Sequence, residues 1–314
     1  MIRRTAAVVL LGLMAAPGAA GAVGVTTRTF TKTSVTTGEP RPLATVIWYP
    51  AVARTGTPEA LGLRDATVRK GRFPFVVFSH GTCGRPTEST YLTIALAKAG
   101  LVVAAPAHLG NTADDPECFT PATFADSAAN RVPDVRFVID SMLVLADDPA
   151  SPFSAHLQSD RIAVAGLSFG GYTTLSALQQ EPRTRAGLVM VPGGTAFLGP
   201  TDITQPTMVI GSERDAIVGF PESEHAFERL AGPRFLVELL AANHLSVVDS
   251  CYNEDLGVDF CVADDIPQET AHRLVLRYAL PFVRRYLAER PVARRKLTRQ
   301  VDGVVLTAEP RRLD

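Results

Sequence analysis

The residues with the clearest chemical meaning form the pattern Gly166-Leu-Ser-Phe-Gly170 near the middle of the chain. A run of β-branched and small apolar residues, 162–165, precedes the pattern, and helix-forming residues follow it. This context predicts a strand, a sharp turn and a helix, with Ser168 at the apex as a nucleophile. The two glycines let the backbone approach closely, and the helix start would direct its N–H groups toward developing negative charge. The alternative is a tight turn that only exposes a serine.

Two later residues are of the types that a serine nucleophile needs. Serine is a weak nucleophile at its own pKa and requires a base, and imidazole titrates near neutral pH. Asp215 and His244 each follow a short apolar run. The order Ser168, Asp215, His244 matches the order of a Ser-Asp-His triad, and the separations of 47 and 29 residues suit one or two strand–helix units between members. In this arrangement Asp215 would fix the tautomer of His244. Glu213 is the alternative acid.

A second oxyanion donor is expected directly after a buried strand. The continuous apolar run 73–78 predicts a strand that is covered on both faces, and it ends in Ser79-His-Gly-Thr82. A His-Gly pair at this position would place the N–H of Thr82 beside the N–H of Phe169, the residue after the nucleophile. We expect His80 to brace this loop rather than to act as a base.

The remaining polar candidates lack a matching context. Four histidines fall in predicted loops or helices and are interpreted as surface or packing residues: His108, His156, His225 and His272. Three acids in one loop resemble metal ligands, but an acidic solvated loop is the preferred interpretation: Asp114, Asp115 and Glu117. The prediction is therefore an enzyme without a metal or another cofactor.

The elements around these motifs alternate between strands and helices. Strands are expected at 25–33, 43–49, 73–78, 101–106, 162–165, 188–191, 207–210 and 234–240. Helices are expected at 87–99, 131–146, 169–178, 222–230 and 266–287, and the polar segment 53–72 is expected to be a surface loop. The first two strands flank a turn and should be antiparallel, whereas the later alternation implies a mainly parallel sheet with helices on both faces. Loops at the strand carboxyl ends would then share one crevice.

The first 22 residues have the features of a secretory signal peptide. A positive segment, 1–4, precedes an apolar run, 6–16, which is too short to span a bilayer comfortably, and small residues end at Ala20-Gly-Ala22. An uncleaved anchor is the alternative. The predicted organisation is a signal peptide at 1–22, a catalytic domain at 23–290 and a C-terminal tail at 291–314 that could form a short hairpin. Cleavage would move the formal net charge from −1 to −3, which suggests neither nucleic acid nor an anionic membrane as a partner.

The chain has four cysteines, and in an exported protein these are expected to form disulfides. Four cysteines allow three connectivities. Cys251 and Cys261 lie ten positions apart, and this short separation favours a bond between them. Cys83 would then pair with Cys118 by elimination. Four free buried thiols are the alternative.

Five motifs together resemble a known family: Val46-Ile-Trp-Tyr-Pro50, Val77-Phe-Ser-His-Gly-Thr82, Gly166-Leu-Ser-Phe-Gly-Gly171, Ser212-Glu-Arg-Asp215 and Asn243-His-Leu-Ser246. Over residues 41–286 the chain is similar to the platelet-activating-factor acetylhydrolase and predicted dienelactone hydrolase group of α/β-hydrolases. The resemblance implies the α/β-hydrolase fold, Ser168 as nucleophile, Asp215 as acid and His244 as base, with Thr82 and Phe169 as oxyanion donors. Dienelactone hydrolases use a cysteine nucleophile, whereas this elbow holds serine. The overall plan is also similar to that of secreted polyester and cutinase-like hydrolases.

These features predict a secreted serine carboxylic-ester hydrolase that works through an acyl-enzyme at Ser168. The expected partner is a small-molecule or polymeric ester, with no nucleic acid, no stable membrane anchor and a monomeric state. Hydrolysis of a lactone, a short-chain phospholipid, a polyester or a peptide remains open, as does a catalytically silent binding protein on the same scaffold. The complete set of serine, acid and histidine argues against the silent scaffold.

Overall fold

The computed structural model describes residues 21–310, apart from 254–257, 260 and 263. Its strands are β1 (Val23–Thr33), β2 (Pro40–Pro50), β3 (Thr57–Glu59), β4 (Gly62–Arg64), β5 (Phe73–Ser79), β6 (Val102–Pro106), β7 (Leu157–Leu167), β8 (Thr184–Met190), β9 (Thr207–Ser212), β10 (Arg234–Leu239), β11 (Tyr252–Asn253), β12 (Val258–Asp259) and β13 (Val304–Glu309). Its helices are α1 (Thr90–Lys98), α2 (Pro121–Asp147), α3 (Phe169–Gln180), α4 (Phe220–Glu228), α5 (Gln268–Tyr286) and α6 (Arg295–Thr298), with 3-10 turns η1 (Thr195–Phe197) and η2 (His244–Val247).

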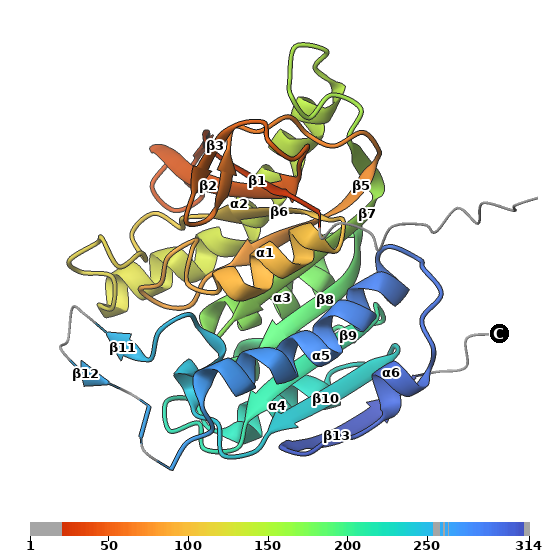
Figure 1. The fold of residues 1–314 in the computed structure, drawn as a ribbon. Coiled ribbons are helices and arrows are strands. Elements are labelled where there is room, and N and C mark those ends of the chain that lie inside the picture. Colours follow the sequence, from red (N-terminus) through yellow and green to blue (C-terminus); the bar gives the residue numbers. More distant parts are fainter. Residues whose placement is uncertain (1–20, 254–257, 260, 263, 311–314) are drawn as a thin grey trace, which may run out of the picture.

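One mixed sheet organises the fold (Figure 1). Within the described residues its strand order is β13-β10-β9-β8-β7-β5-β6-β2-β1-β4-β3. The strands from β10 to β6 in this order are all parallel to one another, whereas β1 and β2 form the predicted antiparallel pair. Because the central strands are parallel, their carboxyl ends meet at one edge of the sheet, as the alternating sequence pattern predicted.

Helices cover both faces of the sheet, and β5 shows how the sequence arranges this. Phe75 and Val77 belong to a buried cluster with the apolar side of α2, whereas Val76 and Phe78 belong to a cluster with α1 and α5. Successive side chains of a strand point to opposite faces, so a continuous apolar run requires cover on both sides. Helices α3 and α4 share a third cluster with β8, β9 and β10. Figure 1 shows α1 and α5 together on one face.

Helix α2 begins ten residues earlier than the apolar spacing predicted. Thr120 caps its first turn by accepting a hydrogen bond from the N–H of Thr123, 3.2 Å away, and Pro121 stands at the first helical position. Both features are typical of a helix start. The segment 53–72, expected to be a loop, contains the short strands β3 and β4, which pair with each other and extend the sheet beyond β1.

The C-terminal segment takes a different form from the hairpin that we expected for 291–314. Its described part contains the short helix α6 and the strand β13, and β13 pairs antiparallel with β10 at the edge of the sheet. Arg234 and Glu309 join the two strands with a bidentate ion pair, with Nη2–Oε2 at 2.8 Å. The partner of the strand is therefore distant in sequence, which is why no local turn pattern identified it.

The predicted signal peptide lies almost wholly outside the described residues, which begin at Gly21. None of the helices in the described part of the chain is long and apolar enough to cross a membrane.

Candidate active site

Ser168 occupies a strained turn between β7 and α3. Its backbone φ is 53°, a left-handed value that is uncommon for a residue with a side chain. A Cβ atom on Gly166 would lie 2.4 Å from the carbonyl oxygen of Gly170, and one on Gly170 would lie 1.9 Å from the carbonyl oxygen of Ser79. Neither position has room for a side chain, so the two glycines of the motif serve the close backbone approach that the sequence predicted.

The structure places Asp215 and His244 side by side in the loops that follow β9 and β10. The Nδ1 atom of His244 is 2.7 Å from Oδ2 of Asp215, and both side chains are buried. Glu213, the alternative acid, is exposed, and its Oε2 accepts a hydrogen bond from the N–H of Ala241 at 2.7 Å. Of the two candidate acids, it is therefore Asp215 that contacts the histidine.

The surroundings of Asp215 favour its charged form. Burial alone would raise the pKa of this carboxyl, but the hydrogen bond and charge of His244 and two backbone amides outweigh it and hold the pKa below its ordinary value. The amides belong to Ile217 and Val218, and each lies 3.0 Å from Oδ1. An ionised Asp215 accepts the Nδ1–H of the imidazole, which leaves Nε2 as the proton acceptor.

Ser168 and His244 line one cavity of about 860 Å³ at the carboxyl ends of the strands. Its other lining residues are mainly apolar: Phe119, Phe124, Ala125, Ala128, Leu167, Phe169, Tyr172, Phe197, Ile217, Val218, Leu245 and Val248. The rings of Phe124 and Phe169 stack with centroids 4.6 Å apart. Among the described residues the Ser168 hydroxyl makes no hydrogen bond, as is common before substrate binds.

The two predicted oxyanion donors meet in this cavity. Thr82 and Phe169 both line it, Thr82 from the loop after β5 and Phe169 from the first residue of α3. Within the described part of the chain, neither backbone N–H donates a hydrogen bond, so both are available to a substrate. A virtual Cβ on Gly81 would lie 3.5 Å from Cβ of Ser168, so the loop passes directly beside the serine.

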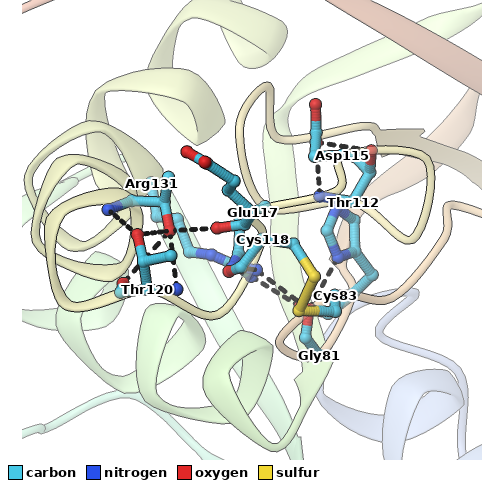
Figure 2. The surroundings of a disulfide bond; sticks show 11 residues. Gly81, Cys83, Thr112, Asp115, Glu117, Cys118, Thr120 and Arg131 are labelled. Atoms are coloured by element: carbon cyan, nitrogen blue, oxygen red, sulfur yellow. Dashed lines mark hydrogen bonds between the residues drawn. A yellow bond between two sulfur atoms is a disulfide. The ribbon is translucent and has the colours of Figure 1, made fainter.

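Both predicted disulfides are present. Cys83 is bonded to Cys118 and Cys251 to Cys261, with Cα–Cα distances of 5.4 Å in each case. Figure 2 shows the first bond, which joins the loop of Thr82 to the loop before α2. The second follows the segment of His244, and Sγ of Cys251 lies 3.7 Å from the carbonyl oxygen of Leu245.

The acidic loop before α2 is held by local contacts. Oδ2 of Asp115 accepts hydrogen bonds from the N–H of Thr112 at 2.8 Å and from its hydroxyl at 2.7 Å (Figure 2). Asp114 is exposed and lies 3.5 Å from Arg85. The described residues contain no group of three or more His, Cys, Asp and Glu side chains that could hold a metal ion.

A second Ser–His–Asp arrangement, which sequence reasoning missed, lies beneath the site. Ser79 Oγ is 2.9 Å from Nε2 of His108, and Nδ1 of His108 is 2.9 Å from Oδ2 of Asp134. Arg41 binds the same carboxylate with two nitrogens at 3.0 Å. All three members are inaccessible to solvent and none lines the cavity. Burial, with the charge of Arg131, lowers the pKa of His108 to about 4, so its imidazole is neutral beside the ionised Asp134, and this buried set is structural.

In comparisons with known proteins, the chain is similar to several hydrolases. The model of a family described as PET hydrolase-like matches residues 118–257, and that of platelet-activating factor acetylhydrolase, isoform II, matches residues 64–138. A platelet-activating factor acetylhydrolase from Canis lupus familiaris is 26% identical over 72% of this chain, and the chain spans 60% of that relative's length. Cutinase est2 from Thermobifida alba is 27% identical over 54% of this chain and 52% of its own.

One solved structure similar to this chain is a ferulic acid esterase from Streptomyces cinnamoneus. Its TM-score is 0.71 at 22% sequence identity, and the match covers 93% of this chain and 98% of the other. The likeness extends over the sheet and its flanking helices, and it confirms the fold class that the sequence predicted.

Proposed function

We propose that this chain, an α/β-hydrolase of the platelet-activating-factor acetylhydrolase group, is a secreted serine carboxylic-ester hydrolase with Ser168 as nucleophile. The observation that carries the proposal is the contact of 2.7 Å between Nδ1 of His244 and Oδ2 of Asp215, with His244 and Ser168 lining the same cavity. A buried, oriented imidazole that shares a cavity with a serine on an elbow is the arrangement that nucleophilic acyl transfer requires.

In the proposed reaction, Nε2 of His244 takes the proton of the Ser168 hydroxyl as its oxygen attacks the ester carbonyl. The tetrahedral intermediate collapses when the imidazolium gives this proton to the leaving alcohol, and an acyl-enzyme remains on Ser168. Water, activated by the same imidazole, then releases the acid and regenerates the serine. Asp215 holds the imidazole in the required tautomer and stabilises its charged form throughout.

The negative oxygen of the intermediate would be bound by the N–H groups of Thr82 and Phe169. Phe169 also begins helix α3, whose positive end faces the same point. Losing one donor of this kind typically costs about 2.7–4 kcal/mol of transition-state stabilisation. Each of these two amides is therefore expected to contribute about a hundredfold to a thousandfold to kcat.

The substrate class follows from the apolar lining of the cavity. A cavity of about 860 Å³ with stacked phenylalanines accepts a hydrophobic acyl or alcohol group more readily than a charged one. The similar proteins are named as a platelet-activating factor acetylhydrolase, a cutinase and a ferulic acid esterase. We propose a hydrophobic small-molecule or polymeric ester as the substrate.

Secretion rests on the first 22 residues and on the two disulfides. Disulfides persist in oxidising compartments, and the N-terminal pattern is that of a cleavable signal peptide. N-terminal sequencing of the exported protein should begin at Val23. A start at Met1 in the membrane fraction would indicate an uncleaved anchor instead.

The proposed activity is tested by hydrolysis of a p-nitrophenyl ester with and without an organophosphate. We expect complete inhibition and a mass increase on the peptide that contains Ser168. A panel of p-nitrophenyl esters of graded chain length, a short-chain phospholipid and a polyester film then defines the substrate. Failure to hydrolyse any of these esters, together with no labelling of Ser168, would instead support a silent binding scaffold.

A further inference from the structure

Two peptide groups flank Gly81, one shared with His80 and one with Thr82. Nearly all of their N–H and C=O groups make hydrogen bonds. The carbonyl of His80 accepts a hydrogen bond from Nη1 of Arg131 at 2.5 Å, and the N–H of Gly81 donates to Oε1 of Glu88 at 2.6 Å. The carbonyl of Gly81 accepts from Nη2 of Arg131 at 3.0 Å and lies 2.7 Å from Nδ1 of His80. Among the described residues, the N–H of Thr82 is the one polar group of these two peptides that has no hydrogen-bond partner.

The carbonyl of Gly81 and the N–H of Thr82 belong to the same peptide group. A peptide is planar, and in its trans form the C=O and N–H bonds point in opposite directions. Holding the carbonyl therefore fixes the direction of the N–H, and Thr82 lines the cavity beside Ser168. We propose that Arg131 is a positioning residue of the oxyanion hole, whose guanidinium orients the N–H of Thr82 toward the substrate; this rests on the ester hydrolysis proposed above.

Arg131 contacts the segments of both proposed donors. Its side chain is 1% exposed, and its Cζ lies 4.3 Å from the ring centroid of Phe169, whose N–H is the second donor. Figure 2 shows Arg131 near Gly81 and the Cys83–Cys118 disulfide. One rigid, planar group thus touches the two chain segments whose relative position defines the oxyanion hole.

The hydrogen bonds of Arg131 go to neutral groups. Besides the two carbonyls, Nη2 donates to Oδ1 of Asn111 at 2.6 Å and Nη1 to the hydroxyl of Ser79 at 3.1 Å. In the described part of the chain no carboxylate lies within ion-pair distance of it; Glu88 and Asp134 act on it only through longer-range attraction, and Arg41 repels it. A cation bonded to a carbonyl polarises that peptide and strengthens its N–H as a donor. The positive charge of Arg131 therefore acts on the Gly81–Thr82 peptide, whose N–H would bind the oxyanion.

The tautomer of His80 supports the same arrangement. Its Nε2 accepts a hydrogen bond from the N–H of His108 at 3.0 Å, so in the neutral ring Nδ1 carries the proton and donates to the carbonyl of Gly81. Burial and the charge of Arg131 hold the pKa of His80 well below its ordinary value, which keeps the ring neutral. Arg131 and His80 thus donate to the same oxygen.

The test compares Arg131→Lys and Arg131→Gln with Arg41→Gln, which removes a buried arginine that contacts neither donor segment. We measure kcat and KM for a p-nitrophenyl ester, the affinity of an aryl trifluoromethyl ketone that forms an oxyanion on Ser168, the affinity of the product acid, and the melting temperature. Both Arg131 variants should lose about tenfold to hundredfold in kcat, with matching losses in ketone affinity and little change in KM or product affinity. Arg41→Gln should lose stability but keep its kcat within about twofold.

Folded Arg131 variants that keep kcat and ketone affinity within about twofold of wild type would overturn the proposal, as would an equal loss of kcat in Arg41→Gln. If the Arg131 variants do not fold, His80→Leu and His80→Asn carry the test. The first removes a donor to the Gly81 carbonyl, and the second keeps an N–H near the same place, so only the first should lose ketone affinity. The function itself is judged separately, because wild type must hydrolyse the ester and Ser168→Ala must not.

Discussion

Asp249 caps helix α1 from a segment 159 residues further along the chain, because its Oδ2 accepts a hydrogen bond from the N–H of Thr90 at 2.7 Å. Its Oδ1 also accepts from the N–H of Tyr91 at 3.2 Å, while Ser89, the residue at the cap position, makes no side-chain cap. The N–H of Asp249 donates to the carbonyl of Glu88 at 2.8 Å. The segment that follows His244 is thereby joined to the helix that follows the loop of Thr82.

Asp249→Ala is expected to lower the free energy of unfolding by about 1 kcal/mol, the typical value of a helix cap. It should also lower kcat, since the base and the oxyanion loop lose a direct connection. Urea denaturation and steady-state kinetics measure the two effects. Asp249→Asn keeps an acceptor oxygen and serves as the matched control; equal behaviour of the two variants would show that the cap has no part in this coupling.

Ser168→Ala is expected to abolish ester hydrolysis while leaving the fold intact. Only the weak effect of binding and the oxyanion amides would remain. Circular dichroism and the p-nitrophenyl ester assay check both points. A variant that retained more than about one hundredth of the wild-type rate would remove Ser168 from its proposed role.

Asp215→Asn is expected to lower kcat by orders of magnitude, because an amide in place of the carboxylate favours the wrong tautomer of His244. Glu213→Gln is the matched control: it changes an exposed acid two residues away whose contact is with the N–H of Ala241. Its effect should be mild. The kcat values of the two variants test this assignment. A larger loss of kcat in Glu213→Gln than in Asp215→Asn would make Glu213 the acid of the triad.

Much of this arrangement could be predicted because its determinants are local in sequence. The crowding around Gly166 and Gly170 produces a short glycine-serine-glycine pattern, and a strand buried on both faces leaves an unbroken apolar run such as 73–78. The order of Ser168, Asp215 and His244 then follows from the connectivity of a parallel sheet. Each of these features depends on residues that are close together in the chain, so one sequence is enough to predict them.

The network under the oxyanion loop could not be predicted in this way. Arg41 and Asp134 are 93 residues apart, and Arg131 lies 50 residues from the carbonyl that it binds. In the sequence, Arg131 is one more charged residue on a predicted helix, and His108 is an isolated histidine in a loop. Tertiary packing determines which buried charged residues come into contact. No local sequence pattern predicts these contacts. The same holds for β13, whose partner β10 is distant in the chain.

The buried histidines should contribute less to the free energy of unfolding in mild acid than at neutral pH. Burial lowers the pKa of His108 to about 4 and that of His80 well below its ordinary value, so both are neutral in the folded protein. Unfolded histidine titrates near 6.5, so this stabilisation is complete above about pH 6.5 and is lost as the pH falls toward the folded values. From pH 7.5 to 5, His108 alone should account for a loss of about 2 kcal/mol.

Urea denaturation at several pH values measures this loss. Between pH 7.5 and 5, His108→Asn should change the free energy of unfolding by about 2 kcal/mol less toward instability than wild type does, whereas His225→Asn, which replaces an exposed histidine, should follow wild type. The lowered pKa values of Asp134 and Asp215 affect stability only in stronger acid, but burial raises the pKa of Glu88 to about 8, so Glu88 adds stability as the pH falls through the same window. The loss due to His108 is therefore measured as the difference between wild type and His108→Asn. An unchanged slope in His108→Asn would show that His108 does not titrate as described.

The disulfide of Cys83 should control both stability and rate, because Cys83 directly follows the proposed donor Thr82. Its bond closes a separation of 35 residues, whereas the bond of Cys251 closes one of 10. Loop-closure entropy predicts losses of about 4 and about 3 kcal/mol for removal of the two bonds. The double substitution Cys83→Ser/Cys118→Ser should also lower kcat, since it frees the loop whose N–H must point at the substrate.

Non-reducing peptide mapping of the exported protein comes first and should recover a peptide pair for each bond. A peptide that links Cys83 to Cys251 or Cys261, or four free thiols, would contradict the pairing. Urea denaturation and kinetics then compare Cys83→Ser/Cys118→Ser with Cys251→Ser/Cys261→Ser. Affinity for the aryl trifluoromethyl ketone should fall in the first variant, because that bond adjoins the oxyanion loop. If only stability changed there, the positions of the Gly81 and Thr82 peptides would be set by Arg131, His80 and Glu88 without help from the disulfide.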